Sequence, residues 1–234
     1  MPMQQHVIAI DGPAGSGKST AARRLAEASG FTYLNTGAMY RAVTFLSMEN
    51  GIDLNDAARV AEVASGMRFE YRIQIHDGHQ RFIVNGRDCT EALFTAALTG
   101  QLKPVVNNVA VRQALVEKMR RAAVEVVEAG AKGVVMEGRD IGTVVFPEAP
   151  IKFYIHADLG ARTARRAIQL QSRGESVDVD GLRKQIQYRD ETDRAREVGR
   201  LIQAVDAIDV DTTDLDEEAT LQRLLLEVRK RGWE

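Results

Sequence analysis

Hydrophobic and polar positions along the chain alternate between two patterns, one with the period of strands and one with the period of helices. Short, continuous apolar runs predict buried parallel strands at residues 7–10, 31–35, 133–136, 151–155 and 207–210. Apolar positions at helical spacing predict helices at residues 18–29, 37–50, 56–64, 106–130, 158–172, 179–194 and 216–231. This alternation predicts an α/β fold, a three-layer sandwich with a parallel central sheet.

The stretch from about residue 67 to 101 interrupts this alternation. Apolar and polar residues alternate from Phe69 to Ile75, as far as the turn Asp77-Gly78, and residues 81–84 run back to the turn Asn85-Gly86. Such a pattern is typical of half-buried antiparallel strands. We therefore expect a hairpin-containing insert that is more like a substrate flap than a layer of the core.

The loop between the first strand and the first helix has the spacing G-x-x-x-x-G-K-S. Glycines let the backbone turn so that successive N–H groups point at phosphate oxygens, and the helix N-terminus adds its dipole. In such a loop Lys18 supplies charge to the β- and γ-phosphates, as an exposed ligand, and the Ser19 hydroxyl is a ligand for Mg²⁺. An ordinary glycine-rich turn is the alternative. The loop predicts a phosphate cradle made of Gly12, Pro13, Ala14, Gly15, Ser16, Gly17, Lys18, Ser19 and Thr20.

Two further loops at strand ends carry polar residues. The stretch from Thr36 to Arg41 offers backbone amides, a hydroxyl and a guanidinium to a second phosphate, although a simple N-cap with a surface arginine has the same pattern. Residues 137–142, Glu-Gly-Arg-Asp-Ile-Gly, follow a predicted strand at the carboxyl end, where α/β sheets place ligands. A solvated turn is the alternative there.

Two helices carry charged residues at helical spacing. Arg162, Arg165 and Arg166 fall on one face, where a cluster of arginines could neutralise the charge that develops in phosphoryl transfer. Charged residues also follow one another at helical spacings of four and three, at Arg189, Asp193 and Arg196. All three could therefore face one cleft. A solvated helix face and a surface ion-pair ladder are the respective alternatives.

Composition limits the possible partners. The chain has 234 residues, 44% of them hydrophobic, and a formal net charge of −2, which argues against bulk binding of nucleic acid. The single cysteine, Cys89, excludes an intramolecular disulfide and is expected to be a small buried hydrophobe. His76 and His79 bracket a hairpin turn without a third metal ligand nearby. We expect a cytoplasmic monomer with no membrane or nucleic-acid partner.

Five features of the sequence occur together. They are Asp11-Gly12-Pro13, residues 36–41, the insert, residues 138–147 and Arg189-Asp190-x-x-Asp193-x-x-Arg196. Together they resemble the motifs of bacterial cytidylate kinases, and the resemblance covers nearly the whole chain. It implies transfer of the ATP γ-phosphate to CMP or dCMP, with Mg²⁺, in pyrimidine metabolism. It also implies one P-loop kinase domain over residues 1–234, with an acceptor-binding insert at 36–103 and a lid at 157–175.

The resemblance also assigns roles to residues. Thr36, Arg41 and Arg139 would hold the acceptor phosphate, and the ribose and phosphate would meet Arg189, Asp193 and Arg196. The cradle and the arginine spacing, rather than the resemblance, are the basis for expecting Lys18, Arg162, Arg165 and Arg166 to be catalytic. Arg112 and Asp140 would read the cytosine, and an aspartate acceptor does prefer the exocyclic amino group of cytosine to the carbonyl of uracil.

The chain departs from the family pattern at four positions. Asn35 and His156 stand where aspartates are usual, Phe94 replaces an expected arginine, and Lys103 aligns with a serine that touches the base. A kinase for another nucleoside monophosphate or a small metabolite is the alternative function, and a P-loop ATPase or switch is a more distant one. No N-K-x-D stretch for guanine is present. Turnover that depends on an acceptor separates kinases from hydrolases.

Overall fold

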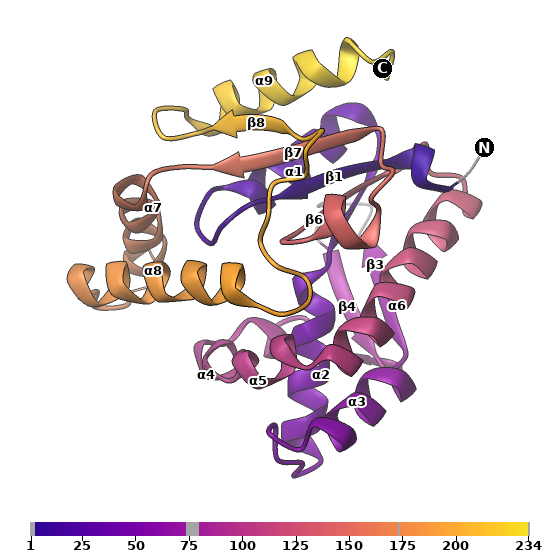
Figure 1. Cartoon of the computed structure of the whole chain (residues 1–234), viewed down its shortest axis with the longest axis vertical. Helices are drawn as coiled ribbons and strands as arrows, with labels where there is room; N and C mark the ends of the chain where they lie inside the picture. Colours follow the sequence, from indigo (N-terminus) through magenta and orange to yellow (C-terminus); the bar gives the residue numbers. More distant parts are fainter. Residues whose placement is uncertain (1–2, 74–79, 173, 234) are drawn as a thin grey trace. The chain divides into compact units, whose positions relative to one another are not determined.

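The computed structural model describes residues 3–73, 80–172 and 174–233, and contains a five-stranded sheet of order β2-β6-β1-β7-β8 (Figure 1). β1 pairs in parallel with β6 and β7, and β7 pairs in parallel with β8. The predicted α/β class is therefore confirmed. The strands are β1 (Val7–Asp11), β2 (Thr32–Asn35), β6 (Val134–Gly138), β7 (Ile151–His156) and β8 (Ile208–Asp211).

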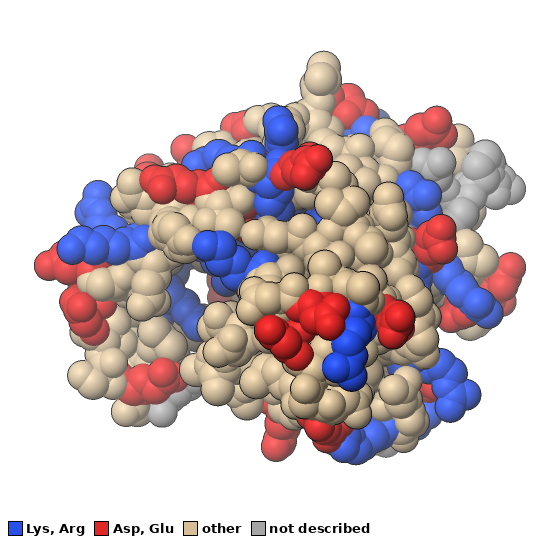
Figure 2. All heavy atoms as spheres, turned by 60° about the horizontal axis from the view of Figure 1, so that its bottom comes forward, with Lys and Arg blue, Asp and Glu red and all other residues tan. Residues whose placement is uncertain are grey.

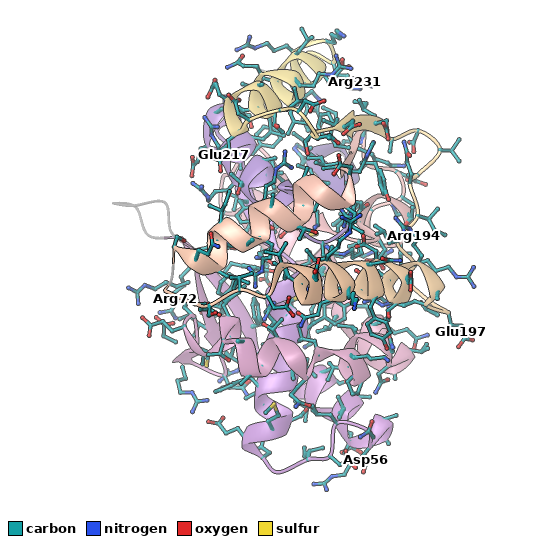
Figure 3. All side chains as sticks on the ribbon, turned by 90° about the vertical axis from the view of Figure 1, so that its left-hand side faces the viewer. Asp56, Arg72, Arg194, Glu197, Glu217 and Arg231 are labelled. Atoms are coloured by element: carbon teal, nitrogen blue, oxygen red, sulfur yellow. The ribbon has the colours of Figure 1, made fainter. Side chains whose placement is uncertain are left out.

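The central strands are largely buried, and most of their side chains are apolar. Ile8 and Ile10 of β1 lie in one cluster with Phe153 of β7, Leu25 of α1 (Lys18–Ser29) and Leu224 of α9 (Glu217–Arg229). Leucines recur at helical spacing in α9, so that the helix buries one stripe against the cluster. Figure 3 labels Glu217 at the start of this helix and Arg231 just beyond its end.

A pair of helices, α7 (Leu159–Gln171) and α8 (Val179–Ala195), lies between β7 and β8 in the sequence. They pack against each other through a small apolar cluster of Ala167, Leu182 and Ile186. Figure 3 shows them side by side, with Arg194 and Glu197 near the end of α8. The carboxylate of Asp158 accepts a hydrogen bond from the amide of Ala161 and so caps the start of α7.

The chain forms two compact units, one of residues up to 33 and from 126, and one of residues 34–125. In the second unit β3, β4 and β5 form an antiparallel sheet, in which Phe69 is the register partner of Val84. Antiparallel strands were expected here, whereas the predicted turn at 77–78 and its histidines lie outside the described residues. The strands are β3 (Phe69–Ile73), β4 (Gln80–Val84) and β5 (Arg87–Asp88).

The helices of the second unit are α2 (Gly37–Glu49), α3 (Ala57–Gly66), α4 (Ala96–Gly100), α5 (Leu102–Asn107) and most of α6 (Val109–Glu128), with a 3₁₀ turn at Ala92–Phe94. The prediction of one helix over 106–130 is wrong, because Asn108 interrupts it. The backbone of Asn108 is extended, and its side-chain oxygen accepts from the amides of Ala110 and Val111, as an N-cap does. Val109, expected on the apolar face, is 37% exposed.

The surface carries charges of both signs. Figure 2 shows acidic and basic side chains interspersed over the face that it presents. Among the described residues, no helix is long and apolar enough to cross a bilayer.

Candidate active site

The loop from β1 to α1 has a backbone that requires glycine at two places. A Cβ on Gly12 would lie 2.0 Å from the carbonyl oxygen of Ile155 on β7, so the strands leave no room for any side chain. Gly17, at the N-cap of α1, has a φ of 82°, in the left-handed region that L-residues avoid. The loop can therefore turn into the N-terminus of α1 directly after a buried strand, which is the geometry of a phosphate cradle.

Lys18 lies inside this loop rather than on its surface. The residue is 5% exposed, and its Nζ donates to the carbonyl oxygen of Pro13 at 2.9 Å. The expectation of an exposed lysine is wrong, because the loop backbone wraps around its side chain. Burial lowers the pKa of Lys18 to about 7, with a further lowering by Arg139, and Glu137 opposes both.

Oxygen donors gather where α1 begins. The Ser19 hydroxyl donates to Glu137 Oε1 at 2.8 Å, and the hydroxyl of Tyr33 donates to the same oxygen at 3.2 Å. Glu137 is buried near the carboxyl end of β6, the strand beside β1. The sequence places Glu137 in a loop expected to be functional but gives it no specific role, and it gives Tyr33 none. The position of Glu137 after an apolar run, at the ligand-binding edge of the sheet, was the available signal.

Asp193 of α8 joins two of the predicted arginines. Arg139 Nε donates to Asp193 Oδ2 at 2.8 Å, and the guanidinium of Arg196 donates to Oδ1. Burial alone would raise the pKa of Asp193, but the neighbouring Arg139 and Arg196 outweigh it and hold this pKa below its usual value. Arg189, on the same helix, is exposed and lowers it further. Two guanidinium groups are thus fixed on one buried carboxylate.

The three arginines of α7 do not meet at one point, although they share a helical spacing. Arg162 is buried, and its guanidinium donates to Asp190 Oδ2 at 2.5 Å and to the carbonyl oxygen of Ala14 in the cradle at 3.0 Å. Arg165 donates to Oγ1 and the carbonyl oxygen of Thr212, and Arg166 to the side chain of Gln169. Only Arg162 therefore contacts the cradle directly.

Asp190 is a further residue that sequence reasoning left without a role. Its carboxylate also lies 3.4 Å from the amide nitrogen of Ala14, so it accepts from the cradle as well as from Arg162. The pair spans 28 positions, from α7 to α8, and it depends on how these helices pack. A spacing rule within one helix cannot find such a pair.

The second unit holds the other predicted acceptor residues. Arg41 donates to the carbonyl oxygen of Leu93 at 3.0 Å and to Thr99 Oγ1 at 2.8 Å, and its guanidinium lies over the ring of Phe94, 5.0 Å from the centroid. Phe94, at which the resemblance led us to expect an arginine, therefore lies under the guanidinium of Arg41. Thr36 is buried before α2, and its side chain makes no capping hydrogen bond to the helix.

Arg112 of α6 is buried in the same unit. Its guanidinium donates to the carbonyl oxygen of Val106 at 3.3 Å and lies 5.5 Å from the centroid of the Tyr40 ring. The other expected departures from the family pattern lie in different surroundings. The carbonyl oxygen of Asn35 accepts from the Tyr71 hydroxyl, His156 Nε2 lies 2.9 Å from Asp209 Oδ2, and Lys103 is exposed.

Other places offer less. Cys89 is buried, as expected, and the part of the chain that the structure describes contains no group of three residues suited to holding a metal ion. A hollow of about 510 Å³ lies along β8 and α9, and none of the predicted site residues lines it. The chemistry therefore concentrates at the cradle and at the adjoining ends of β1 and β6.

The structure has a glycine-rich loop between β1 and α1, a buried lysine inside that loop and a carboxylate at the end of the neighbouring strand β6. These features define a P-loop phosphate-binding protein. A family model described as cytidylate kinase matches residues 8–230. The chain therefore belongs to the cytidylate kinase family, and the resemblance seen in its sequence is confirmed.

Curated relatives agree with this assignment. A cytidylate kinase of Caldanaerobacter subterraneus subsp. tengcongensis is 40% identical over 223 residues, which are 95% of this chain and 94% of that protein. A bifunctional pantoate ligase/cytidylate kinase of Synechococcus sp. (strain CC9605) is 40% identical over 230 residues, which are 97% of this chain and 46% of that protein. The chain thus spans about half the length of this bifunctional relative.

The crystal structure of an uncharacterized protein from Eubacterium ventriosum resembles the chain with a TM-score of 0.51 at 14% identity. The match covers 97% of this chain and 99% of that one. At this identity the likeness concerns the fold alone.

Proposed function

We propose that the protein transfers the γ-phosphate of ATP to CMP or dCMP and releases ADP with CDP or dCDP. The observation that carries the proposal is the arrangement within one compact unit of the cradle, Lys18 and the Arg139–Asp193–Arg196 cluster. Membership of the cytidylate kinase family supports the choice of acceptor. In the reaction an oxygen of the acceptor phosphate attacks the γ-phosphorus, and the bond to the β,γ-bridging oxygen breaks.

The cradle would hold the donor. Backbone amides of the loop and the N-terminus of α1 favour the charge of the triphosphate, and Lys18 adds a cation beside the β- and γ-phosphates. Arg162 is already bound to the carbonyl oxygen of Ala14, so its charge lies beside the same loop. We assign to α7, and to the lid at 157–175, the role of covering the donor when both nucleotides are bound.

The donor atoms near the cradle fit Mg²⁺. Ser19 and Glu137 present a hydroxyl and a carboxylate 2.8 Å apart, and Mg²⁺ is usually held by one or two carboxylates together with substrate phosphates. Mg²⁺ bound there would neutralise charge on the transferred phosphate. Ser19 and Glu137 are the residues that would hold it. Activity should accordingly be lost when divalent cations are chelated.

Residues at the end of β6 and on α8 would contact the acceptor. Asp193 accepts hydrogen bonds from Arg139 and Arg196 and so orients both guanidinium groups before the acceptor binds. They can then contact its phosphate or ribose without first being ordered. Asp140, the next residue after Arg139, is buried and can accept from a cytosine amino group. The compactness of residues 34–125 supports an acceptor-binding role for the insert at 36–103, with Thr36 and Arg41 as contacts inside the insert and Arg112 as a contact on α6.

A coupled assay of ADP release across the nucleoside monophosphates tests the proposal. CMP and dCMP should give rapid release, AMP and GMP little, and ATP alone only slow release. Fast release that does not depend on an acceptor would show an ATPase instead. Preference for another acceptor would agree with a kinase activity but would overturn the assignment of CMP or dCMP as the acceptor.

A further inference from the structure

A carboxylate next to the cradle ties β1 to the segment that carries the acceptor residues. Asp11 is the last residue of β1, directly before Gly12, and it is 5% exposed. Its Oδ1 accepts from the amide of Ile141 at 2.8 Å, and its Oδ2 accepts from the amide of Gly142 at 2.7 Å. These two amides directly follow Arg139 and Asp140.

The two amides would otherwise be buried donors without acceptors within their own segment. Ile141–Val145 forms a single π-helical turn, in which the amide of Val145 donates to the carbonyl oxygen of Asp140 at 3.1 Å. The first amides of any helical turn lack an acceptor inside that turn. Asp11 supplies both acceptors from another strand, and its two oxygens fix the orientation of two consecutive peptide groups.

The far end of the same segment is held by β7, which lies on the other side of β1 from β6. Lys152 of β7 is buried and donates to the carbonyl oxygen of Pro147 at 2.5 Å and to Asp206. A Cβ on Gly142 would lie 3.1 Å from Cδ of Lys152 and 3.4 Å from Oδ2 of Asp11. The start of the segment therefore depends on Asp11, and its end depends on Lys152.

Because Asp11 is a buried acid, its contacts with the two amides are sensitive to substitution of its side chain. Burial raises the pKa of Asp11 to about 7, although the amides of Gly142 and Ile141 pull it down. Its two oxygens accept from the amides of Ile141 and Gly142, and these two amides compensate the burial of the carboxylate. A side chain of the same shape that donates instead of accepting would force one amide away.

We propose that Asp11 is a positioning residue for acceptor recognition, because its carboxylate holds the amides of Ile141 and Gly142 and so fixes where Arg139 and Asp140 lie beside the cradle. The proposal rests on the proposed function for its substrate, and it adds a residue that makes no contact with the acceptor itself. Two adjacent residues then have different roles: Gly12 belongs to the donor site, and Asp11 serves the acceptor site.

Asp11→Asn tests the proposal, because the amide keeps one acceptor and turns a donor toward a backbone N–H. An unsatisfied buried donor costs enough to lower kcat/KM for CMP by about tenfold or more. We expect this loss mainly in the KM for CMP, with a smaller preference for CMP over UMP and a KM for ATP within about threefold of the original. An unchanged KM for CMP, or an equal rise for ATP, would overturn the proposal.

Two further measurements keep the test decisive. Gly142→Ala crowds Lys152 and Asp11 without changing charge, so it should give the same acceptor-specific loss even if Asp11→Asn folds poorly. Amide exchange followed by NMR needs no substrate, and it should speed up at Ile141 and Gly142 in either variant. Unchanged exchange there would refute the anchor, whereas faster exchange in a protein that does not use CMP would refute only the proposed function.

Discussion

At the scale of single residues, several charged groups at and near the cradle are buried and hydrogen-bonded rather than exposed to solvent. Lys18 donates to the backbone of its own loop, and Asp193 holds two arginines at once. The sequence allowed the residue types and the cradle to be predicted, because the glycine spacing is local. Burial and long-range partners are not local properties, so the sequence led us to expect an exposed Lys18 and gave Asp11 and Glu137 no specific role.

Lys18→Ala is expected to abolish transfer while leaving the fold intact. The lysine is a cation for phosphates, and removing it takes away a contact worth several kcal/mol in the transition state, so kcat should fall by at least about a hundredfold. A buried amine is not needed by the core, and the melting temperature should hardly change. Near-normal turnover in steady-state assays would contradict the catalytic role of Lys18.

The lowered pKa of Lys18 predicts that nucleotide binding is linked to proton uptake. With a pKa of about 7 the amine is mostly neutral at pH 8, and anionic phosphates beside it favour the charged form, so binding raises the pKa. Titration calorimetry with ATP at pH 8, in buffers of different ionisation enthalpy, should show uptake of up to about one proton. Lys18→Arg should abolish this dependence, because arginine stays charged.

A binding enthalpy of the unmodified protein that does not vary with the buffer would contradict this assignment. It would mean that Lys18 is already charged before ATP binds.

At the scale of elements, apolar periodicity predicted the strands of the main sheet and α1 closely, because each is a strong pattern bounded by glycine or polar residues. It failed at Asn108, where an apolar pattern continues across a helix break that a capping side chain imposes. It also missed α4 and α5, which are short, and short helices owe their stability to tertiary packing rather than to their own sequence.

α7 is the element that we expect to respond to substrates. Arg162 links it to the cradle through Ala14, and a site that excludes water only with both nucleotides present needs such an element to close. Hydrogen exchange over 159–171 should slow when a bisubstrate analogue binds. Exchange in α9, which packs in the core, serves as the internal control and should stay the same; equal exchange in α7 with and without the analogue would count against a lid.

At the scale of the whole molecule, the sequence motifs led to the correct family, since the family model covers residues 8–230. They did not reveal the pairing of Arg162 with Asp190 or the anchor at Asp11. Both join segments far apart in the chain, and only the packing of strands and helices brings them together. The division into two compact units likewise follows from contacts that no local pattern contains.

The most direct test of the account is the ratio of kcat/KM for CMP to kcat/KM for UMP, measured for the unmodified protein and for Asp140→Ala. If Asp140 accepts from the cytosine amino group, CMP should lead by at least about tenfold, because a buried polar group left unpaired costs roughly 1–3 kcal/mol. Asp140→Ala should remove most of this preference rather than slow both substrates equally. Equal use of CMP and UMP by the unmodified protein, or full discrimination by the variant, would contradict the account.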